Sequence, residues 1–162
     1  SNFQPFRDDN LLVSHNGNID NFRKSLYRPM RELFCDEIYQ SIEGNTDSEH
    51  IFALLLNELG SNPDSSLEKA LEKTLTTMTD LAKLHHVSFS ANTVISDGHC
   101  LVASRYAYGT TSPTLYWLRD DPMYPDAVII ASEPLFEGNW NSCKNSSIVT
   151  VAENLDVKVH QL

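Results

Sequence analysis

The order of residue patterns along the chain is the feature that most constrains its fold. Residues 47–59 and 66–86 carry apolar side chains at helical spacing, whereas residues 87–95 are rich in β-forming residues. The pair Asp97–Gly98 then gives a hairpin signal before the next strand-like run. Helices that precede hairpin-connected strands predict an α+β layered fold and disfavour a doubly wound parallel sheet.

Shorter patterns predict the remaining elements. Pro29 interrupts a helical stretch at residues 19–28, and residues 31–42 are predicted to form another helix. Capping boxes at Thr46–Glu49 and Ser65–Glu68 mark the starts of the two long helices. The other strands are expected at 11–15, 99–107, 114–118, 127–132, 146–152 and 156–161.

Length and charge restrict the class of protein. A chain of 162 residues suffices for one domain with a hydrophobic core, so we expect residues 1–162 to form a single domain. No apolar run approaches the length of a membrane span, and no targeting segment opens the chain. The formal net charge of −10 opposes binding to phosphate backbones. We therefore expect a cytoplasmic protein with no nucleic-acid and no membrane partner.

The cysteines and histidines give no sign of a metal or a cofactor. The three cysteines, an odd number without close pairing, favour a reducing compartment over a disulfide framework. No CxxC or HxxxH pattern is present, so the sequence predicts no metal site and no cofactor. Cys35 is predicted to be a buried, unreactive thiol on the apolar face of a helix.

The stretch LLVSHNGNID at residues 11–20 contains the first candidate for chemistry. We expect the strand to end at the HNG triplet, where Asn16–Gly17 could form a hairpin turn. The following residues resemble a helix entry instead of a second strand, which weakens that interpretation. The alternative is an oxyanion hole, in which the Asn16 amide and the Gly17 backbone N–H stabilise negative charge on a reacting carbonyl oxygen.

Asp47 is the second candidate. Thr46, Asp47 and Glu49 fit the start of a helix, where acidic side chains are stabilised. The same carboxylate could also accept hydrogen bonds from a bound ammonium group, so a capping role and a binding role both remain open.

Four further residues are weighed mainly as structural. The pair Ser132–Glu133 precedes Pro134 at the end of a strand, so a turn is the simpler interpretation of it. We expect His15 to hold its loop by hydrogen bonds. Arg105 could form an ion pair or line a wall of the site, and we favour the ion pair. No GxSxG motif or phosphate-binding glycine loop is present.

Five segments occur in a fixed order along nearly the whole chain: SNFQPF, LLVSHNGNIDNF, NTDSEHIFALL, LVASRYA and IIASEPL. Together they resemble the class II glutamine amidotransferases, which are N-terminal-nucleophile hydrolases. The resemblance implies an αββα sandwich. Gln4 stands where that family usually has histidine.

The resemblance also implies a reaction. In that family an N-terminal cysteine attacks a γ-glutamyl amide, a thioester forms, and water releases glutamate. Asn16 and Gly17 would form the oxyanion hole, and Asp47 would bind the α-ammonium group of the substrate. The likeness is to members that act in fungal glutathione degradation, which implies glutamine or a γ-glutamyl peptide as substrate and a peptidase-like partner subunit.

The start of the chain departs from the family pattern. Ser1 stands next to the Asn2 stretch, so its place is wrong for the nucleophile, and the family's first strands, cysteine and carboxylate-binding arginine would precede Asn2. We expect an N-terminally incomplete catalytic domain, inactive and poorly stable by itself because sheet edges would be exposed. The alternative is a non-catalytic subunit that binds a γ-glutamyl ligand or acts as a scaffold.

Overall fold

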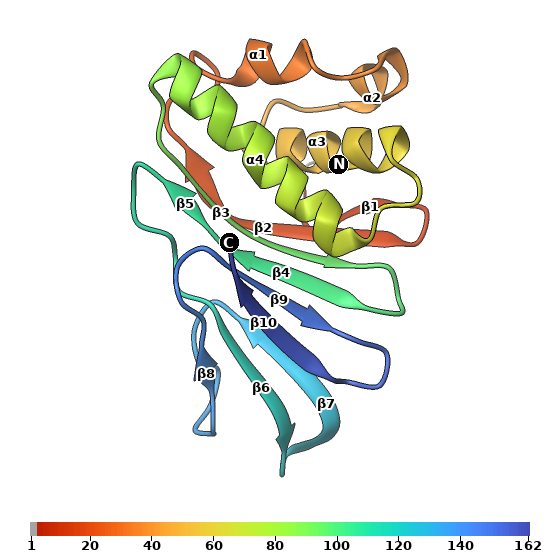
Figure 1. Ribbon diagram of the computed structural model, residues 1–162, viewed down its shortest axis with the longest axis vertical. Coiled ribbons are helices and arrows are strands. Elements are labelled where there is room, and N and C mark those ends of the chain that lie inside the picture. The colour runs from red at the N-terminus through yellow and green to blue at the C-terminus, as the bar shows by residue number, and fades with distance from the viewer. Residues whose placement is uncertain (1–2) are drawn as a thin grey trace.

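In the computed structural model, which describes residues 3–162, antiparallel strands form two sheets and four helices cover one of them (Figure 1). The larger sheet has the strand order β1-β2-β3-β4-β9-β10, with β5 also paired to β3. The smaller sheet has the order β7-β6-β8. The strands are β1 (Phe6–Asp8), β2 (Leu11–Ile19), β3 (Phe89–Ser96), β4 (Leu101–Arg105), β5 (Ala107–Tyr108), β6 (Tyr116–Asp121), β7 (Tyr124–Ala131), β8 (Asn141–Ser142), β9 (Ser147–Val151) and β10 (Val157–Gln161).

The two faces of the larger sheet carry different apolar clusters. The main core contains side chains of the helices together with one face of the sheet, including Phe89, Val102 and Ile148. Residues next to these along the same strands, such as Ala103 and Val149, belong to a second cluster with Leu115 and Trp117 of the smaller-sheet region. Because neighbouring side chains of a strand point to opposite faces, the layers run helices, larger sheet, smaller sheet.

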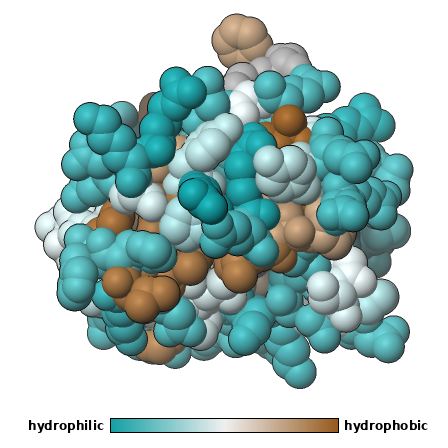
Figure 2. Space-filling model, turned by 90° about the horizontal axis from the view of Figure 1, so that it is seen from above, coloured by the Kyte–Doolittle hydropathy of each residue, from teal (hydrophilic) through white to brown (hydrophobic). Residues whose placement is uncertain are grey.

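The helical layer consists of α1 (Tyr27–Arg31), α2 (Asp36–Ser41), α3 (Asp47–Ser61) and α4 (Leu67–His85). Figure 1 shows α3 and α4 lying over the larger sheet. From above, the molecule is mostly hydrophilic, with hydrophobic side chains gathered in a band across the middle of the view (Figure 2). No helix within residues 3–162 combines the length and the apolar character that a membrane span requires.

The caps of the two long helices explain where they begin and end. The Thr46 side chain accepts the Glu49 N–H, as predicted for the start of α3. The cap of α4 is Ser66, which accepts the Lys69 N–H, so the predicted capping box at Ser65 was wrong by one residue. α4 ends at His85, and its C-cap residue His86 has a left-handed backbone, with φ of 54°.

Two sequence-based boundaries were wrong. β2 does not end at HNG, since it pairs with β3 in continuous register as far as Ile19 opposite Phe89. The predicted helix at 31–42 is divided between α1 and α2, and Pro29 lies inside α1 instead of interrupting a helix. Proline is tolerated there because the N–H groups of a first helical turn have no intrahelical acceptor. The β3–β4 hairpin at Asp97–Gly98 is confirmed.

Candidate active site

β2 extends past its pairing with β1, and along this edge it presents further backbone N–H groups. The pairing with β1 ends at Val13, and further along this edge the His15 N–H donates to Gln4 Oε1 and the Ile19 N–H to Asp47 Oδ2. N–H groups of alternate residues in a strand point to the same side. The Gly17 N–H therefore faces the same edge, between those of His15 and Ile19.

The pairing with β3 supports this orientation of Gly17. Its partner across the ladder is Ala91, whose N–H donates away from β2, to the Tyr106 carbonyl. In an antiparallel ladder the two residues of such a pair both direct their N–H and C=O groups outward. The Gly17 N–H is therefore a backbone donor that points away from β3.

Gly17 is required because no side chain fits at this position. Its φ of 159° is nearly extended, so backbone strain is not the reason. A Cβ built there would lie 2.1 Å from the Ser90 carbonyl oxygen and 2.8 Å from His15 Nε2. The absence of a side chain at Gly17 leaves room for the neighbouring strand and for the His15 ring.

The side chains of Asn16 and His15 lie on opposite faces of β2. Its Nδ2 donates to Ser132 Oγ over 3.1 Å, although the two residues are 116 positions apart. Ser132 directly follows β7 of the smaller sheet, so this contact joins the two sheets. An amide nitrogen carries two hydrogens, and this bond occupies one of them. The fold thus brings together two candidates from separate motifs.

Asp47 is the first residue of α3 and lies at the same edge of β2. Its Oδ2 accepts the Ile19 N–H at 3.0 Å, and its Oδ1 accepts the Ser48 N–H at 2.8 Å. An ionised carboxylate has about four acceptor positions, so these two bonds leave capacity for a ligand. The helix N-terminus also stabilises its negative charge.

His15 is buried below Gly17 and is hydrogen-bonded through both ring nitrogens. Nδ1 lies 2.8 Å from Ser48 Oγ, and Nε2 lies 3.3 Å from the Ser90 carbonyl oxygen. Burial lowers the pKa of the imidazole, and the Ser90 carbonyl and the Asp47 charge oppose that shift. The prediction that His15 has structural hydrogen bonds is confirmed. Sequence reasoning missed Ser48, whose role is visible only once α3 lies against β2.

A hollow of about 430 Å³ opens beside Asp47. Its wall carries two cationic side chains, Arg23 and Lys24, and neither Asn16 nor Gly17 is among its lining residues. The other lining residues are Asn18, Ile19, Asn21, Phe22, Asn45 and Thr46. Asp47 is therefore accessible from this side, which is compatible with a polar ligand.

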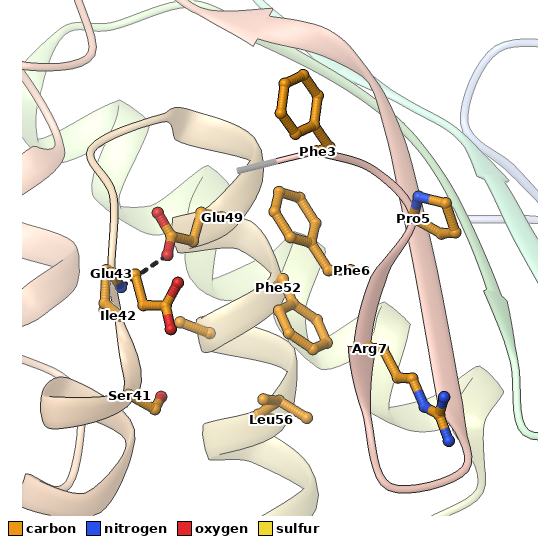
Figure 3. A pocket seen from close by; sticks show the side chains of 11 residues that line it. Phe3, Pro5, Phe6, Arg7, Ser41, Ile42, Glu43, Glu49, Phe52 and Leu56 are labelled. Carbon is orange, nitrogen blue, oxygen red and sulfur yellow. Dashed lines mark hydrogen bonds between the residues drawn. The ribbon is translucent and has the colours of Figure 1, made fainter. Parts of the chain in front are cut away.

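A second cavity, of about 360 Å³, lies between β1 and α3 (Figure 3). The Phe6 and Phe52 rings, which stack on each other with centroids 5.5 Å apart, are part of its lining. Glu49 Oε1 accepts the N–H groups of Glu43 and Gly44, which fixes the loop before Asp47. The capping-box glutamate thus has a second role that the sequence pattern did not suggest.

Two predictions about side chains outside this edge were wrong. The Arg105 guanidinium donates to Ser112 Oγ and to the carbonyls of Pro113 and Cys143, instead of pairing with a carboxylate. Cys35 is exposed, because the helix expected around it is broken there and it becomes the N-cap of α2. All three cysteines are free.

Among residues 3–162, one group of side chains has the ligand types and spacing for a metal ion, namely Glu68, Glu72 and His160. In the structure each nitrogen of the His160 ring is already paired, Nδ1 with Glu68 at 2.9 Å and Nε2 with Glu72 at 2.8 Å. This cluster joins β10 to α4 and includes none of the residues of the β2 edge.

The layered arrangement of helices and two antiparallel sheets is that of the N-terminal-nucleophile hydrolase sandwich. Glutamine phosphoribosylpyrophosphate amidotransferase from Bacillus subtilis shares this fold with a TM-score of 0.64 at 17% identity, over 99% of this chain and 32% of that one. The α+β fold class predicted from sequence is therefore confirmed. Ser1 and Asn2 lie outside the described residues, so the expectations about them stay predictions.

The chain belongs to the class II glutamine amidotransferases, whose family model matches residues 2–158. It is similar to the "Probable glutamine amidotransferase DUG3" of Saccharomyces cerevisiae, with 31% identity over 93% of this chain and 52% of that protein. The chain thus spans about half the length of this curated relative.

Two solved structures are also similar to the chain. A glutamine aminotransferase class-II domain protein from Silicibacter pomeroyi has a TM-score of 0.80 and 27% identity, over 98% of this chain and 70% of that one. A predicted glutamine amidotransferase from Pseudomonas aeruginosa has a TM-score of 0.59 and 25% identity, over 96% of this chain and 64% of that one.

Proposed function

We propose that the protein hydrolyses a γ-glutamyl amide bond, with Asn16 and Gly17 as the oxyanion hole and Asp47 as the binding group for the substrate's α-ammonium. The observation that carries this proposal is the shared edge of β2. There the Gly17 N–H points outward and Asp47 accepts the N–H two residues further on. A donor for a carbonyl oxygen, on β2, and an acceptor for an ammonium group, at the start of α3, thus lie along the same edge of one strand.

The spacing agrees with the size of a γ-glutamyl group. Residues two apart in a strand are separated by about 7 Å. The α-nitrogen and the γ-carbonyl carbon of an extended γ-glutamyl group are about 5 Å apart, by standard bond lengths. One substrate can therefore approach Gly17 with its carbonyl oxygen and Asp47 with its ammonium group.

The nucleophile in the proposed reaction is an N-terminal cysteine outside these 162 residues. Its sulfur bonds to the γ-carbonyl carbon, and the carbonyl electron pair moves to oxygen, where two N–H donors stabilise the oxyanion. As that pair returns, the C–N bond breaks and the amine leaves with the proton taken from the thiol. Water then cleaves the thioester, which gives glutamate and regenerates the thiol.

Glutamine and γ-glutamyl peptides such as glutathione are the proposed substrates, because Asn16, Gly17 and Asp47 would contact only the γ-glutamyl part common to both. The resemblance to amidotransferases of glutathione degradation supports a role in glutathione catabolism. With it we propose a cytoplasmic location and a peptidase-like partner subunit that acts on the released dipeptide.

Glutamate release by the full-length protein, with glutamine and glutathione as separate substrates, tests the proposal. Release from either substrate is expected, and it should disappear when the N-terminal cysteine is replaced by alanine. Glutamate binding without any release would instead favour a non-catalytic γ-glutamyl-binding or scaffolding subunit.

A further inference from the structure

Two hydrogen bonds fasten the start of α3 to β2 on either side of Gly17. The Ile19 N–H donates to Asp47, and His15 Nδ1 lies 2.8 Å from the hydroxyl of Ser48, the residue after Asp47. We propose that Ser48 and His15 form a positioning pair that sets where the Asp47 carboxylate stands relative to Asn16 and Gly17. The inference rests on the proposed function, because it gives Asp47 a substrate to bind.

The direction of the hydrogen bonds follows from the partners of His15. The Ser90 carbonyl can only accept, so the hydrogen of a neutral His15 ring is on Nε2. Nδ1 then carries a lone pair and accepts the Ser48 hydroxyl hydrogen. His15 is only 7% exposed, so its surroundings disfavour the charged ring. In this state the Ser48 hydroxyl points toward β2.

Protonation of His15 would reverse this bond. Nδ1 would then donate to Ser48 Oγ, and the Ser48 hydrogen would turn to another acceptor. Asp47 Oδ1, 3.5 Å from Ser48 Oγ, is in reach. Asp47 is the charged group that acts on His15 from α3, while Ser90 of β3 and Gln4 of the N-terminal stretch present uncharged oxygens. At acidic pH the Ser48 hydroxyl would thus donate to the Asp47 carboxylate, the same group that is proposed to bind the substrate's ammonium group.

The geometry also connects the pair to the proposed oxyanion donor. His15 Nε2 would lie 2.8 Å from a Cβ at Gly17, so the ring forms the floor below this residue. A shift of the ring would therefore move both ends of the site. In the proposed reaction Ser48 contacts neither the reacting carbonyl nor the nucleophile, so it is a positioning residue and not a catalytic one.

Kinetics of the full-length protein with glutamine, together with glutamate binding by calorimetry, test the proposal. Ser48→Ala should raise KM and the glutamate Kd about tenfold while kcat changes less than threefold. Ser48→Thr keeps the hydroxyl and should restore most of the affinity. In the parent, kcat/KM should fall on acidification as His15 is protonated, and Ser48→Ala should flatten that fall.

Thr79→Val is the matched control. It removes a hydroxyl that bridges α4 to Tyr106, at similar volume and without touching the β2 edge. Its KM should equal that of the parent even if its Tm is lower. If KM rises equally in Ser48→Ala and Thr79→Val, or does not change in Ser48→Ala, the positioning role of Ser48 and His15 is wrong, and the proposed function is unaffected. A parent that neither binds glutamate nor releases it would overturn both the pair and the proposed function.

Discussion

The Ile19 N–H donates to Asp47 Oδ2 across 3.0 Å, which ties the first residue of α3 to the last residue of β2. The sequence left two roles open for Asp47, a helix cap and a ligand for an ammonium group. Thr46 is the cap of α3, and the Asp47 carboxylate accepts the Ser48 N–H in the first helical turn. A structural role and a binding role for Asp47 are compatible, because the same carboxylate lies at the strand edge where Gly17 presents its N–H.

Asp47→Asn should weaken substrate binding. The amide keeps the shape of the side chain and loses the negative charge, so we expect KM for glutamine to rise at least tenfold with a smaller change in kcat. Asp36→Asn is the control, because Asp36 is likewise the first residue of its helix, α2. If both variants raise KM equally, Asp47 has no specific role in binding.

Gly17→Ala should lower stability and activity together. The added methyl group would meet the Ser90 carbonyl oxygen at 2.1 Å, and a backbone group of a paired strand cannot move aside easily. The free energy of unfolding should fall by about 1–3 kcal/mol, a typical effect of overpacking.

Gly60→Ala provides the comparison for Gly17→Ala in denaturant melts. Nothing lies within 4 Å of a Cβ at Gly60, which is in α3, so alanine should be neutral or stabilise the protein by up to about 1 kcal/mol. A Gly17→Ala protein as stable as the parent would contradict the close approach of Ser90.

The protein should lose stability as the pH falls below about 6.5. Burial lowers the pKa of both His15 and His50 in the folded state. The unfolded chain, with histidine pKa values near 6.5, then binds more protons, so stability is complete above that pH and decreases toward the folded pKa values. Each histidine contributes a slope of at most about 1.4 kcal/mol per pH unit.

Chemical denaturation between pH 5 and pH 8 measures this slope. His50→Gln should reduce it, because the His50 ring is fully buried, donates to the Thr46 carbonyl and accepts a hydrogen bond from Arg31. A free energy of unfolding that is constant across this range would show that neither ring is held in the neutral form.

Cys35 should react first with a thiol reagent in the native protein. It is exposed, whereas burial raises the pKa of the Cys100 and Cys143 thiols and so reduces the thiolate at neutral pH. The reaction of Cys35, Cys100 and Cys143 should have a fast phase that comes from Cys35. The Cys35→Ser protein should lack this phase. Equal rates at all three would mean that the local packing differs from that described above.

The sequence predicted the main elements because their signals are local. The spacing of leucines gave α3 and α4, and Asp97–Gly98 gave the β3–β4 hairpin. It failed at HNG, where glycine and two asparagines look like a turn but lie inside a strand. β2 tolerates them because β3 pairs along its whole length and Gly17 makes room for Ser90.

Contacts between distant segments could not be predicted from any one segment. The Asn16–Ser132 bond joins positions 116 residues apart, and His15–Ser48 joins a strand to a helix start. Each requires the packing of whole layers. The exposure of Cys35 was missed for the same kind of reason, because the break between α1 and α2 depends on tertiary context.

The kcat of Asn16→Ala, measured as glutamate release by the full-length protein, tests the central claim most directly. Loss of one oxyanion donor should lower kcat for glutamine about 100- to 1,000-fold with little change in KM. Asn141→Ala, which removes an exposed amide on the smaller sheet, should leave both constants unchanged. A kcat for Asn16→Ala within threefold of the parent would contradict the assignment of Asn16 and Gly17 as the oxyanion hole.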